Sequence, residues 1–262
     1  MKTQQPIGIF DSGIGGTSIW KEIKYLLPNE STIYLSDSKN APYGEKSKQE
    51  IIDLSIKNTE FLIDKGCKLI VVACNTATTN AIEYLRLNYN IPIIGIEPAI
   101  KTAALQTKTG TIGILATKGT LNSSLFEKTS ASINHRITII EQVGNGLVEL
   151  IENGKINSTE MTTLLNSHLN LMQSSNCDCI VLGCTHYPYL IPQINKIVGN
   201  NVIIIDSGEA VAKQTKKILE DNKLLSDTKK NIYNTFYINK EKSVLDIILK
   251  DYKGININYL NF

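Results

Sequence analysis

Short apolar segments rich in Ile and Val alternate along the chain with longer segments whose apolar residues recur at helical spacing. The first apolar segment covers residues 7–10 and precedes a predicted helix at about residues 15–27. Because strands with continuous apolar residues suit a sheet that is covered on both faces, the alternation predicts parallel sheets in an α/β fold. Further strands are predicted at residues 32–35, 69–73, 91–96, 111–116, 136–140, 179–182 and 202–205.

The C-terminal tail departs from this alternation. Residues 232–238 and 255–260 have the pattern of edge strands, and they flank one last predicted helix at residues 240–250. We therefore expect the tail to add two strands at the margin of a sheet.

Segments of the first part of the chain recur later in the same order. Residues 8–12 resemble residues 113–117 at an offset of 105, and residues 70–76 resemble residues 180–186 at an offset of 110. A third, looser match relates residues 93–97 to residues 203–207. Matches in one order at nearly one offset predict two similar open-sheet α/β domains related by pseudo-two-fold symmetry. The expected domains are residues 1–97 plus 209–262 and residues 98–208.

Composition restricts the class of protein. The chain has 262 residues and a hydrophobic fraction of 42%, enough to build a core, which excludes a disordered protein. Its 27 Lys and Arg residues nearly balance 25 Asp and Glu residues without any block of five like charges, which argues against nucleic acid as a partner. The sequence shows neither the basic start and apolar run of a secretory signal nor a membrane-spanning segment. We therefore expect a cytoplasmic protein with no membrane partner.

Five cysteines, an odd number, do not form the disulfide framework of a secreted protein. Cys67, Cys177 and Cys179 are best explained as small buried apolar residues. Cys74 and Cys184 differ from them, because each ends a predicted strand and leads into a polar triplet. No metal is expected, because Cys177 and Cys179 lack the two-residue spacer of a typical zinc site and no second cysteine pair occurs.

Polar side chains follow the predicted strands at their carboxyl ends, where open parallel sheets bind ligands. If the two domains face each other about the pseudo-two-fold axis, Cys74 and Cys184 approach one ligand from opposite sides. The cleft between the domains is therefore the predicted site. The strand-end residues are Asp11, Ser12, Cys74, Asn75, Thr76, Thr117, Cys184, Thr185 and His186.

Two thiols on opposite sides of one carbon suit proton transfer that inverts a stereocentre, since one face loses a proton while the other gains one. Ionising a thiol at neutral pH costs only about 2 kcal/mol, so a thiolate base and a thiol acid are both accessible. The neutral donors beside the thiols, together with helix N-termini, suit a carboxylate ligand. Asp11 and Glu152 are candidates to hold an ammonium group or to relay protons to the thiols.

A glycine cluster offers a competing interpretation of the first strand end. Gly13, Gly15 and Gly16 follow a strand as in a dinucleotide-binding loop, but Ser18 occupies the place of the third glycine. Asp11 would also point a negative charge at a pyrophosphate. A nicotinamide cofactor is therefore not expected.

Simpler structural roles compete for some candidates. Asp11 and Ser12 have the chemistry of helix caps, His186 could be a buried histidine with satisfied hydrogen bonds, and Tyr43 could close the turn after Pro42. A helix cap can also line a site, so the two roles are compatible.

Four segments resemble the glutamate racemases of bacterial cell-wall synthesis, which use two cysteines and no pyridoxal phosphate. These segments are residues 10–16 (FDSGIGG), 42–44 (PYG), 73–77 (ACNTA) and 183–188 (GCTHYP). The similarity runs from about Pro6 to the C-terminus. It implies a cofactor-independent isomerase that interconverts L- and D-glutamate, supplies D-glutamate for peptidoglycan and forms a homodimer.

The resemblance also implies residue roles. Cys74 would take the proton from D-glutamate and Cys184 from L-glutamate. Asp11 would serve Cys74, whereas Glu152 and His186 would serve Cys184. The implied substrate pocket consists of Asp11, Ser12, Pro42, Tyr43, Gly44, Asn75, Thr76, Thr117, Thr120, Thr185 and His186.

Three alternatives remain open at this point. Many members of the family carry Cys-Pro and a second proline before the glutamate where this chain has Gly144, Asn145 and Glu149, so Glu149 competes with Glu152 for the catalytic role. The substrate alternative is another acidic amino acid such as aspartate. A non-catalytic binding protein for an acidic amino acid would keep the polar triplets and need neither thiol.

Overall fold

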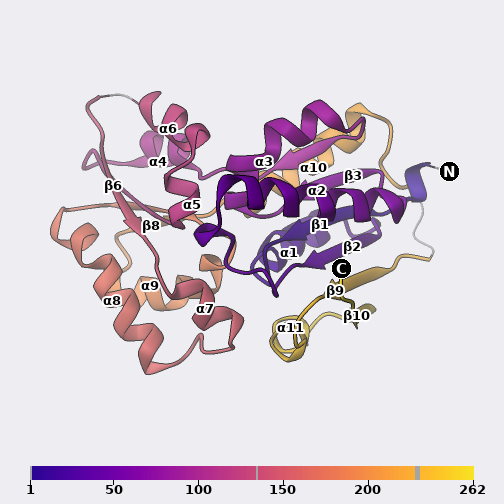
Figure 1. Cartoon of the computed structure of the whole chain (residues 1–262). Coiled ribbons are helices and arrows are strands. Elements are labelled where there is room, and N and C mark those ends of the chain that lie inside the picture. Colours follow the sequence, from indigo (N-terminus) through magenta and orange to yellow (C-terminus); the bar gives the residue numbers. More distant parts are fainter. Residues whose placement is uncertain (1, 134, 228–230) are drawn as a thin grey trace.

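The computed structural model describes residues 2–133, 135–227 and 231–262. Within these ranges the strands form two parallel sheets, one of six strands and one of four (Figure 1). We call the elements around the six-stranded sheet the first half and those around the four-stranded sheet the second half. Both ends of the chain lie in the first half.

The first half is a six-stranded sheet covered by helices on both faces. Its strands are β1 (Ile7–Asp11), β2 (Thr32–Ser36), β3 (Leu69–Val72), β4 (Ile93–Gly95), β9 (Asn234–Ile238) and β10 (Ile255–Tyr259), in the order β10-β9-β2-β1-β3-β4. Its helices are α1 (Thr17–Leu26), α2 (Lys48–Asp64), α3 (Asn75–Asn88), α10 (Gly208–Asp221) and α11 (Ser243–Leu249). Ile7 and Ile9 face α1, α10 and α11, whereas Phe10 faces α2 and α3. Alternate residues of β1 thus point to opposite apolar layers, which explains its continuous apolar sequence.

The second half repeats this arrangement on a smaller scale. Its strands are β5 (Thr111–Ala116), β6 (Thr138–Val143), β7 (Cys179–Gly183) and β8 (Ile203–Ile205), in the order β6-β5-β7-β8. Its helices are α4 (Ile100–Gln106), α5 (Lys118–Leu121), α6 (Ser124–Ala131), α7 (Leu147–Glu152), α8 (Thr159–Ser174) and α9 (Ile191–Val198). Ile112 and Ile114 pack with α4 and α6, and Leu115 packs with α7 and α8. This sheet is therefore also buried on both faces.

The two sheets confirm the predicted α/β fold and explain the recurring segments. The order β2-β1-β3-β4 in the first half corresponds to β6-β5-β7-β8 in the second. The three sequence matches relate β1 to β5, β3 to β7 and β4 to β8, so each match joins strands at equivalent positions. Short 3-10 helices lie at Lys2–Gln4, Tyr43–Glu45 and Tyr187–Leu190.

The prediction for the C-terminal tail was wrong in one respect. Strand β9 is not an edge strand, because it pairs in parallel with β2 on one side and with β10 on the other. Of the two tail strands, only β10 lies at the margin of the sheet. The tail thus adds another strand–helix–strand unit, and the buried Phe236 of β9 packs against Trp20 at 4.9 Å between ring centroids.

The sixth strand was also misplaced by sequence reasoning, which predicted it at residues 136–140. In the structure β6 covers Thr138–Val143 and includes Glu141 and Gln142. As an edge strand of the second sheet it is partly exposed, so it tolerates polar residues that the prediction from apolar runs did not include.

The two halves share a continuous interface. A single apolar cluster includes Ile14 of the first half and Leu147 of the second. The chain passes between the halves twice, near Glu97 and near Ser207, and we call these two places the crossings. There the Ser207 Oγ donates a hydrogen bond to the Glu97 carbonyl oxygen at 2.7 Å. None of the helices in the described part of the chain is both long and apolar enough to span a membrane.

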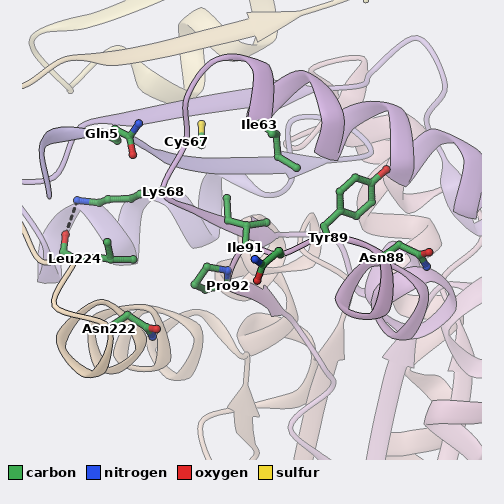
Figure 2. Close-up of a pocket in the computed structure, with 11 residues that line it drawn as sticks. Gln5, Ile63, Cys67, Lys68, Asn88, Tyr89, Ile91, Pro92, Asn222 and Leu224 are labelled. Atoms are coloured by element: carbon green, nitrogen blue, oxygen red, sulfur yellow. Dashed lines mark hydrogen bonds between the residues drawn. The ribbon is translucent and has the colours of Figure 1, made fainter. Parts of the chain in front are cut away.

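A pocket of about 740 Å³ lies at the amino ends of the strands of the first sheet, next to Cys67 and Lys68 (Figure 2). The Lys68 ammonium donates to the Leu224 carbonyl oxygen at 2.9 Å and pairs with Glu30 at 2.5 Å, so this buried cation already has its partners. Burial raises the pKa of the Cys67 thiol to about 12. We assign no chemistry to this pocket, whose lining includes neither Cys74 nor Cys184.

Candidate active site

The carboxyl ends of both sheets meet at one narrow cavity that is lined by both candidate thiols. Cys74 follows β3 in the first half, and Cys184 follows β7 in the second. The space between them is about 10 Å³, roughly enough for one water molecule. The other lining residues are Ser12, Pro42, Tyr43, Gly44, Asn75, Thr76, Thr117, Val148, Thr185 and His186.

Cys74 lies at the N-terminus of α3. Its sulfur accepts a hydrogen bond from the Ala77 backbone N–H at 3.4 Å, and its thiol donates to Ser12 Oγ at 3.6 Å. Burial raises the pKa of Cys74 well above its usual range, and the nearby Asp11 carboxylate raises it further. Cys74 is therefore a protonated thiol at rest, with two contacts in place to stabilise a thiolate.

Asp11, the last residue of β1, is held on both carboxylate oxygens. Its Oδ2 accepts from the backbone N–H groups of Gly13 at 3.1 Å and Gly16 at 2.9 Å. Its Oδ1 accepts from Thr185 Oγ1 of the second half at 3.2 Å. Burial raises the pKa of Asp11 and outweighs the opposing effects of His186 and the two amides. Asp11 is thus a buried carboxyl group that can carry a proton more easily than an exposed one.

Cys184 has a different neighbour, the imidazole of His186. The Cys184 sulfur lies 3.7 Å from His186 Nδ1, and His186 Nε2 lies 2.7 Å from Glu152 Oε1. Burial disfavours the imidazolium, but hydrogen bonds and charge interactions with Cys184 and Glu152 raise the pKa of His186 well above its usual value. The raised pKa favours an imidazolium between the sulfur and the carboxylate, and the Gly15 backbone N–H also lies 3.2 Å from Nε2.

Glu152 completes this chain of contacts. It is the last residue of α7, and its pKa is lowered although burial alone would raise it. The lowering comes from His186, from the Ser38 hydroxyl at 2.7 Å from Oε2 and from the Ile14 backbone N–H at 2.6 Å from Oε1. Glu152 and His186 form a buried ion pair, with 4% and 1% of their side chains exposed.

The glycine-rich loop after β1 makes room for this ion pair. A Cβ atom at position 13 would overlap the Glu152 carboxylate, and one at position 15 would overlap the His186 ring. Two glycines of the loop thus allow close approach of side chains from the second half. This packing explains the cluster that sequence analysis compared with a dinucleotide-binding loop.

Neutral groups supply the remaining polar lining. The side-chain amide of Asn75 is buried, and neither its oxygen nor its nitrogen bonds to a described residue. A buried amide without partners in a cavity wall is a ready site for a polar ligand. Thr76 Oγ1 and Thr117 Oγ1 lie 2.7 Å apart across the interface of the two halves.

Tyr43 is fixed by a polar network behind the cavity. Its hydroxyl donates to Asp37 Oδ2 at 2.5 Å and accepts from Asn58 Nδ2 at 3.1 Å. Asp37 Oδ1 also accepts from Asn239 Nδ2 at 2.5 Å. Because its hydroxyl is occupied by Asp37, Tyr43 lines the cavity without presenting a free hydroxyl to it.

Three of the candidates that we predicted from the sequence lie behind the cavity wall. Asp11 and Glu152 contact the lining through Thr185 and His186, and Thr120 lies behind Thr76 at 3.3 Å between hydroxyl oxygens. The other candidates line the cavity directly.

Glu149, the alternative to Glu152, has a different position. It lines an outer pocket of about 400 Å³ together with Glu45 and Lys118, and it makes no described contact with His186. The outer pocket shares Pro42, Gly44, Thr117 and Val148 with the inner cavity, so the two adjoin each other.

Sequence reasoning missed three residues that contribute to the site. Val148 lines the cavity, Ser38 contacts Glu152, and Asp37 holds Tyr43. Asp37 and Ser38 directly follow β2, so the strand-end rule that found Asp11 and Cys74 could have found them too.

The described residues contain no cluster of three or more His, Cys, Asp or Glu side chains arranged to hold a metal ion. Cys177 and Cys179 are buried, and the Cys177 thiol donates to the Cys179 carbonyl oxygen at 3.0 Å. These two cysteines therefore pack as interior residues.

Comparison with known proteins identifies the class to which this fold and site belong. The sequence pattern of the Asp/Glu/hydantoin racemases matches residues 11–215, most of the chain. The chain therefore belongs to the Asp/Glu/hydantoin racemase family, and its enzyme class is isomerase.

Several relatives are glutamate racemases. The glutamate racemase of Clostridium perfringens is 45% identical over 240 residues, which cover 90% of this chain and 92% of the relative. The crystal structure of Escherichia coli glutamate racemase with L-glutamate and the activator UDP-MurNAc-ala is 32% identical, with a TM-score of 0.87 and 98% of each chain covered. The Francisella tularensis enzyme with D-glutamate is 31% identical, with a TM-score of 0.84 and the same coverage.

Proposed function

We propose that this protein racemises glutamate without a cofactor, using Cys74 and Cys184 as the two proton-transfer groups, and supplies D-glutamate for peptidoglycan. The observation that carries this proposal is the position of the two thiols. They follow equivalent strands, β3 and β7, and line one cavity from opposite halves of the molecule. The glutamate racemases among its relatives, two of which were solved with L- or D-glutamate, support the choice of substrate.

The reaction needs one base and one acid at a time. From D-glutamate, the Cys74 thiolate takes the α-proton, and the Cys184 thiol donates its proton to the opposite face of the planar carbanion. From L-glutamate the roles are reversed. Each turnover breaks one C–H bond and forms another, so no oxidant or reductant takes part.

The neighbouring groups prepare each thiol for its role. Asp11 is the proposed acceptor of the Cys74 proton, because its burial makes protonation of the carboxyl group easier. His186, paired with Glu152, is the proposed partner of Cys184 at 3.7 Å. We prefer Glu152 to Glu149 for this role because Glu152 is the carboxylate bonded to His186.

The substrate carboxylates are the proposed partners of the neutral donors. They would be bound by the Asn75 amide, which has no partner among the described residues, and by the hydroxyls of Ser12, Thr76, Thr117 and Thr185. The rest of the wall consists of Pro42, Tyr43, Gly44 and His186, and behind it lie Asp11 and Thr120. Recognition by local donors suits a protein with a net charge of only +2.

Substrate entry requires the two halves to separate. A cavity of about 10 Å³ is too small for glutamate, and the outer pocket of about 400 Å³ adjoins it. We propose that residues 1–97 plus 209–262 and residues 98–208 move as two domains, with the hinge at the two crossings. We also propose a homodimer, which sedimentation analysis of the purified chain would test.

The paired variants Cys74→Ser and Cys184→Ser test the proposed function. Each should abolish racemisation while leaving exchange of the α-hydrogen with heavy water for one enantiomer only, because one base remains. The two variants should exchange opposite enantiomers. Full racemisation by either variant would overturn the two-thiol mechanism, and a preference of the wild type for aspartate over glutamate would overturn the substrate assignment.

A further inference from the structure

Ser38 makes a contact with Glu152 that joins the two halves at the proposed catalytic ion pair. It lies two residues beyond the end of β2, and only 2% of it is exposed. Its Oγ is 2.7 Å from Glu152 Oε2. The other oxygen, Oε1, is already bound to the Ile14 backbone N–H and to His186 Nε2. Among the described residues, Ser38 is thus the hydrogen-bond partner of Oε2, and His186 contacts the other oxygen, Oε1.

The direction of the hydrogen bonds around Ser38 follows from the charge of Glu152. An ionised carboxylate only accepts hydrogen bonds, so the Ser38 hydroxyl donates to it. The single proton of Ser38 is then used, and the neighbouring hydroxyl of Ser36, 3.0 Å away, must donate to Ser38. The Ser36 hydroxyl therefore donates to Ser38, and the Ser38 hydroxyl donates to Glu152. Glu152 in turn contacts His186, which lies beside Cys184.

We propose that Ser38 is a positioning residue for racemisation: its hydroxyl fixes the Glu152 carboxylate so that Oε1 faces His186, and it stabilises the ion pair beside Cys184. This inference rests on the proposed function for its effect on catalysis. Its effect on the ion pair itself does not depend on that function.

Several charged or titratable groups act on Glu152 besides Ser38. His186, after β7, is its ion-pair partner; Asp11 at the end of β1 and Tyr34 in β2 interact with it electrostatically. Because none of these is changed in a Ser38→Ala variant, a shift in that variant reports the hydroxyl alone.

The test compares the wild type with Ser38→Ala. Loss of a hydrogen bond to a charged group should lower kcat/KM about tenfold. The pH range over which kcat/KM is high should also become narrower at both ends than in the wild type. The acidic limit rises because Glu152 is protonated at a higher pH, and the alkaline limit falls because His186 loses its proton at a lower pH. Ser38→Thr keeps the hydroxyl and should restore most of the activity, and Ser36→Ala should cause a smaller shift in the same direction.

Ser207→Ala is the matched control. It also removes a buried serine hydroxyl that bonds across the two halves, to Glu97, but it touches no residue of the ion pair. It should leave the width of the pH profile unchanged. If Ser38→Ala reduces activity without narrowing the profile, as a mere loss of contact between the halves would, the proposal is wrong.

A measurement without substrate separates this proposal from the proposed function. The chain has three histidines, so the NMR titration of His186 can be assigned with a His186→Asn variant. The pKa of His186 should be lower in Ser38→Ala than in the wild type. An unchanged His186 titration would overturn the role of Ser38, whereas a lowered pKa in a protein that does not racemise glutamate would contradict only the proposed function.

Discussion

Cys74 and Cys184 occupy equivalent places in the two halves, but their surroundings differ. Cys74 follows β3, and its sulfur bonds to the Ala77 amide and Ser12. Cys184 follows β7, and its sulfur faces the imidazole of His186. The buried carboxyl that acts electrostatically on Cys74 is Asp11, whereas His186 lies between Cys184 and Glu152.

The two halves thus share a strand order but place different charged groups beside their thiols. A buried carboxyl of raised pKa accepts a proton and becomes neutral, while an ion-paired imidazolium already holds one. Enantiomers are equal in free energy, so kcat/KM must be equal in both directions in every variant. The asymmetry of the two sides must therefore be sought in kcat and KM separately, in one-sided hydrogen exchange and in pH dependence.

Among the variants that keep both thiols, His186→Asn should have the largest effect. Removing the charged partner of Cys184 should lower kcat/KM by about 100- to 10,000-fold, the usual range for a proton-transfer group. In the proposed mechanism Cys74 takes the α-proton of D-glutamate, so exchange of that proton should survive better than exchange of the α-proton of L-glutamate. Equal loss of exchange from both enantiomers would show that His186 serves both thiols.

Asp11→Asn, a change beside Cys74, should lower activity but raise stability. An asparagine oxygen at the Oδ2 position keeps both amide hydrogen bonds, and Thr185 can accept from its nitrogen instead of donating. Loss of a buried charge should raise Tm by about 2–4 °C, while kcat/KM falls about 100-fold. Thermal unfolding and racemisation assays check both parts; a lower Tm contradicts the idea that burial of this charge is costly.

Glu152→Gln should remove the pH dependence of stability that the ion pair creates. The pKa of Glu152 is held below its ordinary 4.5, so its contribution is complete above that value and is lost as pH falls through the lowered pKa. The pKa of His186 is raised above its ordinary 6.5, so its contribution is complete below that value and is lost as pH rises through the raised pKa.

The pair thus contributes most to stability between about pH 4.5 and 6.5. Urea unfolding at about pH 5.5 should show the wild type more stable than Glu152→Gln by about 1–3 kcal/mol. The difference should shrink as the pH rises through the raised pKa of His186, because the imidazolium is lost there. A difference that grows towards alkaline pH would mean that the pair is not charged as described.

The smallest expected effect is that of Thr120→Val. Its hydroxyl lies behind Thr76 and Thr117 and does not line the cavity. One neutral hydrogen bond is worth about 0.5–1.5 kcal/mol, so KM should rise about two- to tenfold with little change in kcat. Thr117→Val, which changes a lining residue, is the comparison, and its KM should rise further.

Much of the fold could be predicted from the sequence because it depends on local patterns. Continuous apolar segments defined the strands, and the recurrence of residues 70–76 at 180–186 paired β3 with β7. The place of β9 could not be predicted in this way, since pairing with β2 joins residues about 200 positions apart. Local sequence does not specify such a partner.

The site residues likewise fall into those that local sequence could predict and those that it could not. Strand ends alone placed Cys74, Cys184 and their polar triplets in one cleft, because carboxyl ends of parallel strands gather ligand-binding residues. The contacts of Glu152 could not be derived in this way, since its distance from Glu149 in sequence is only three residues and both are helical.

The sequence by itself thus determined that two matched strands each carry a cysteine and that neutral donors surround both. The charged neighbours of each sulfur were implied only by a family resemblance, and the tertiary structure places them: Asp11 acts on Cys74, and His186 with Glu152 lies beside Cys184. The contact between Ser38 and Glu152 comes from the tertiary structure alone. The physical reason is that strand position follows from the local alternation of apolar residues, whereas a hydrogen bond between Ile14 and Glu152, 138 residues apart, depends on how two whole halves pack together.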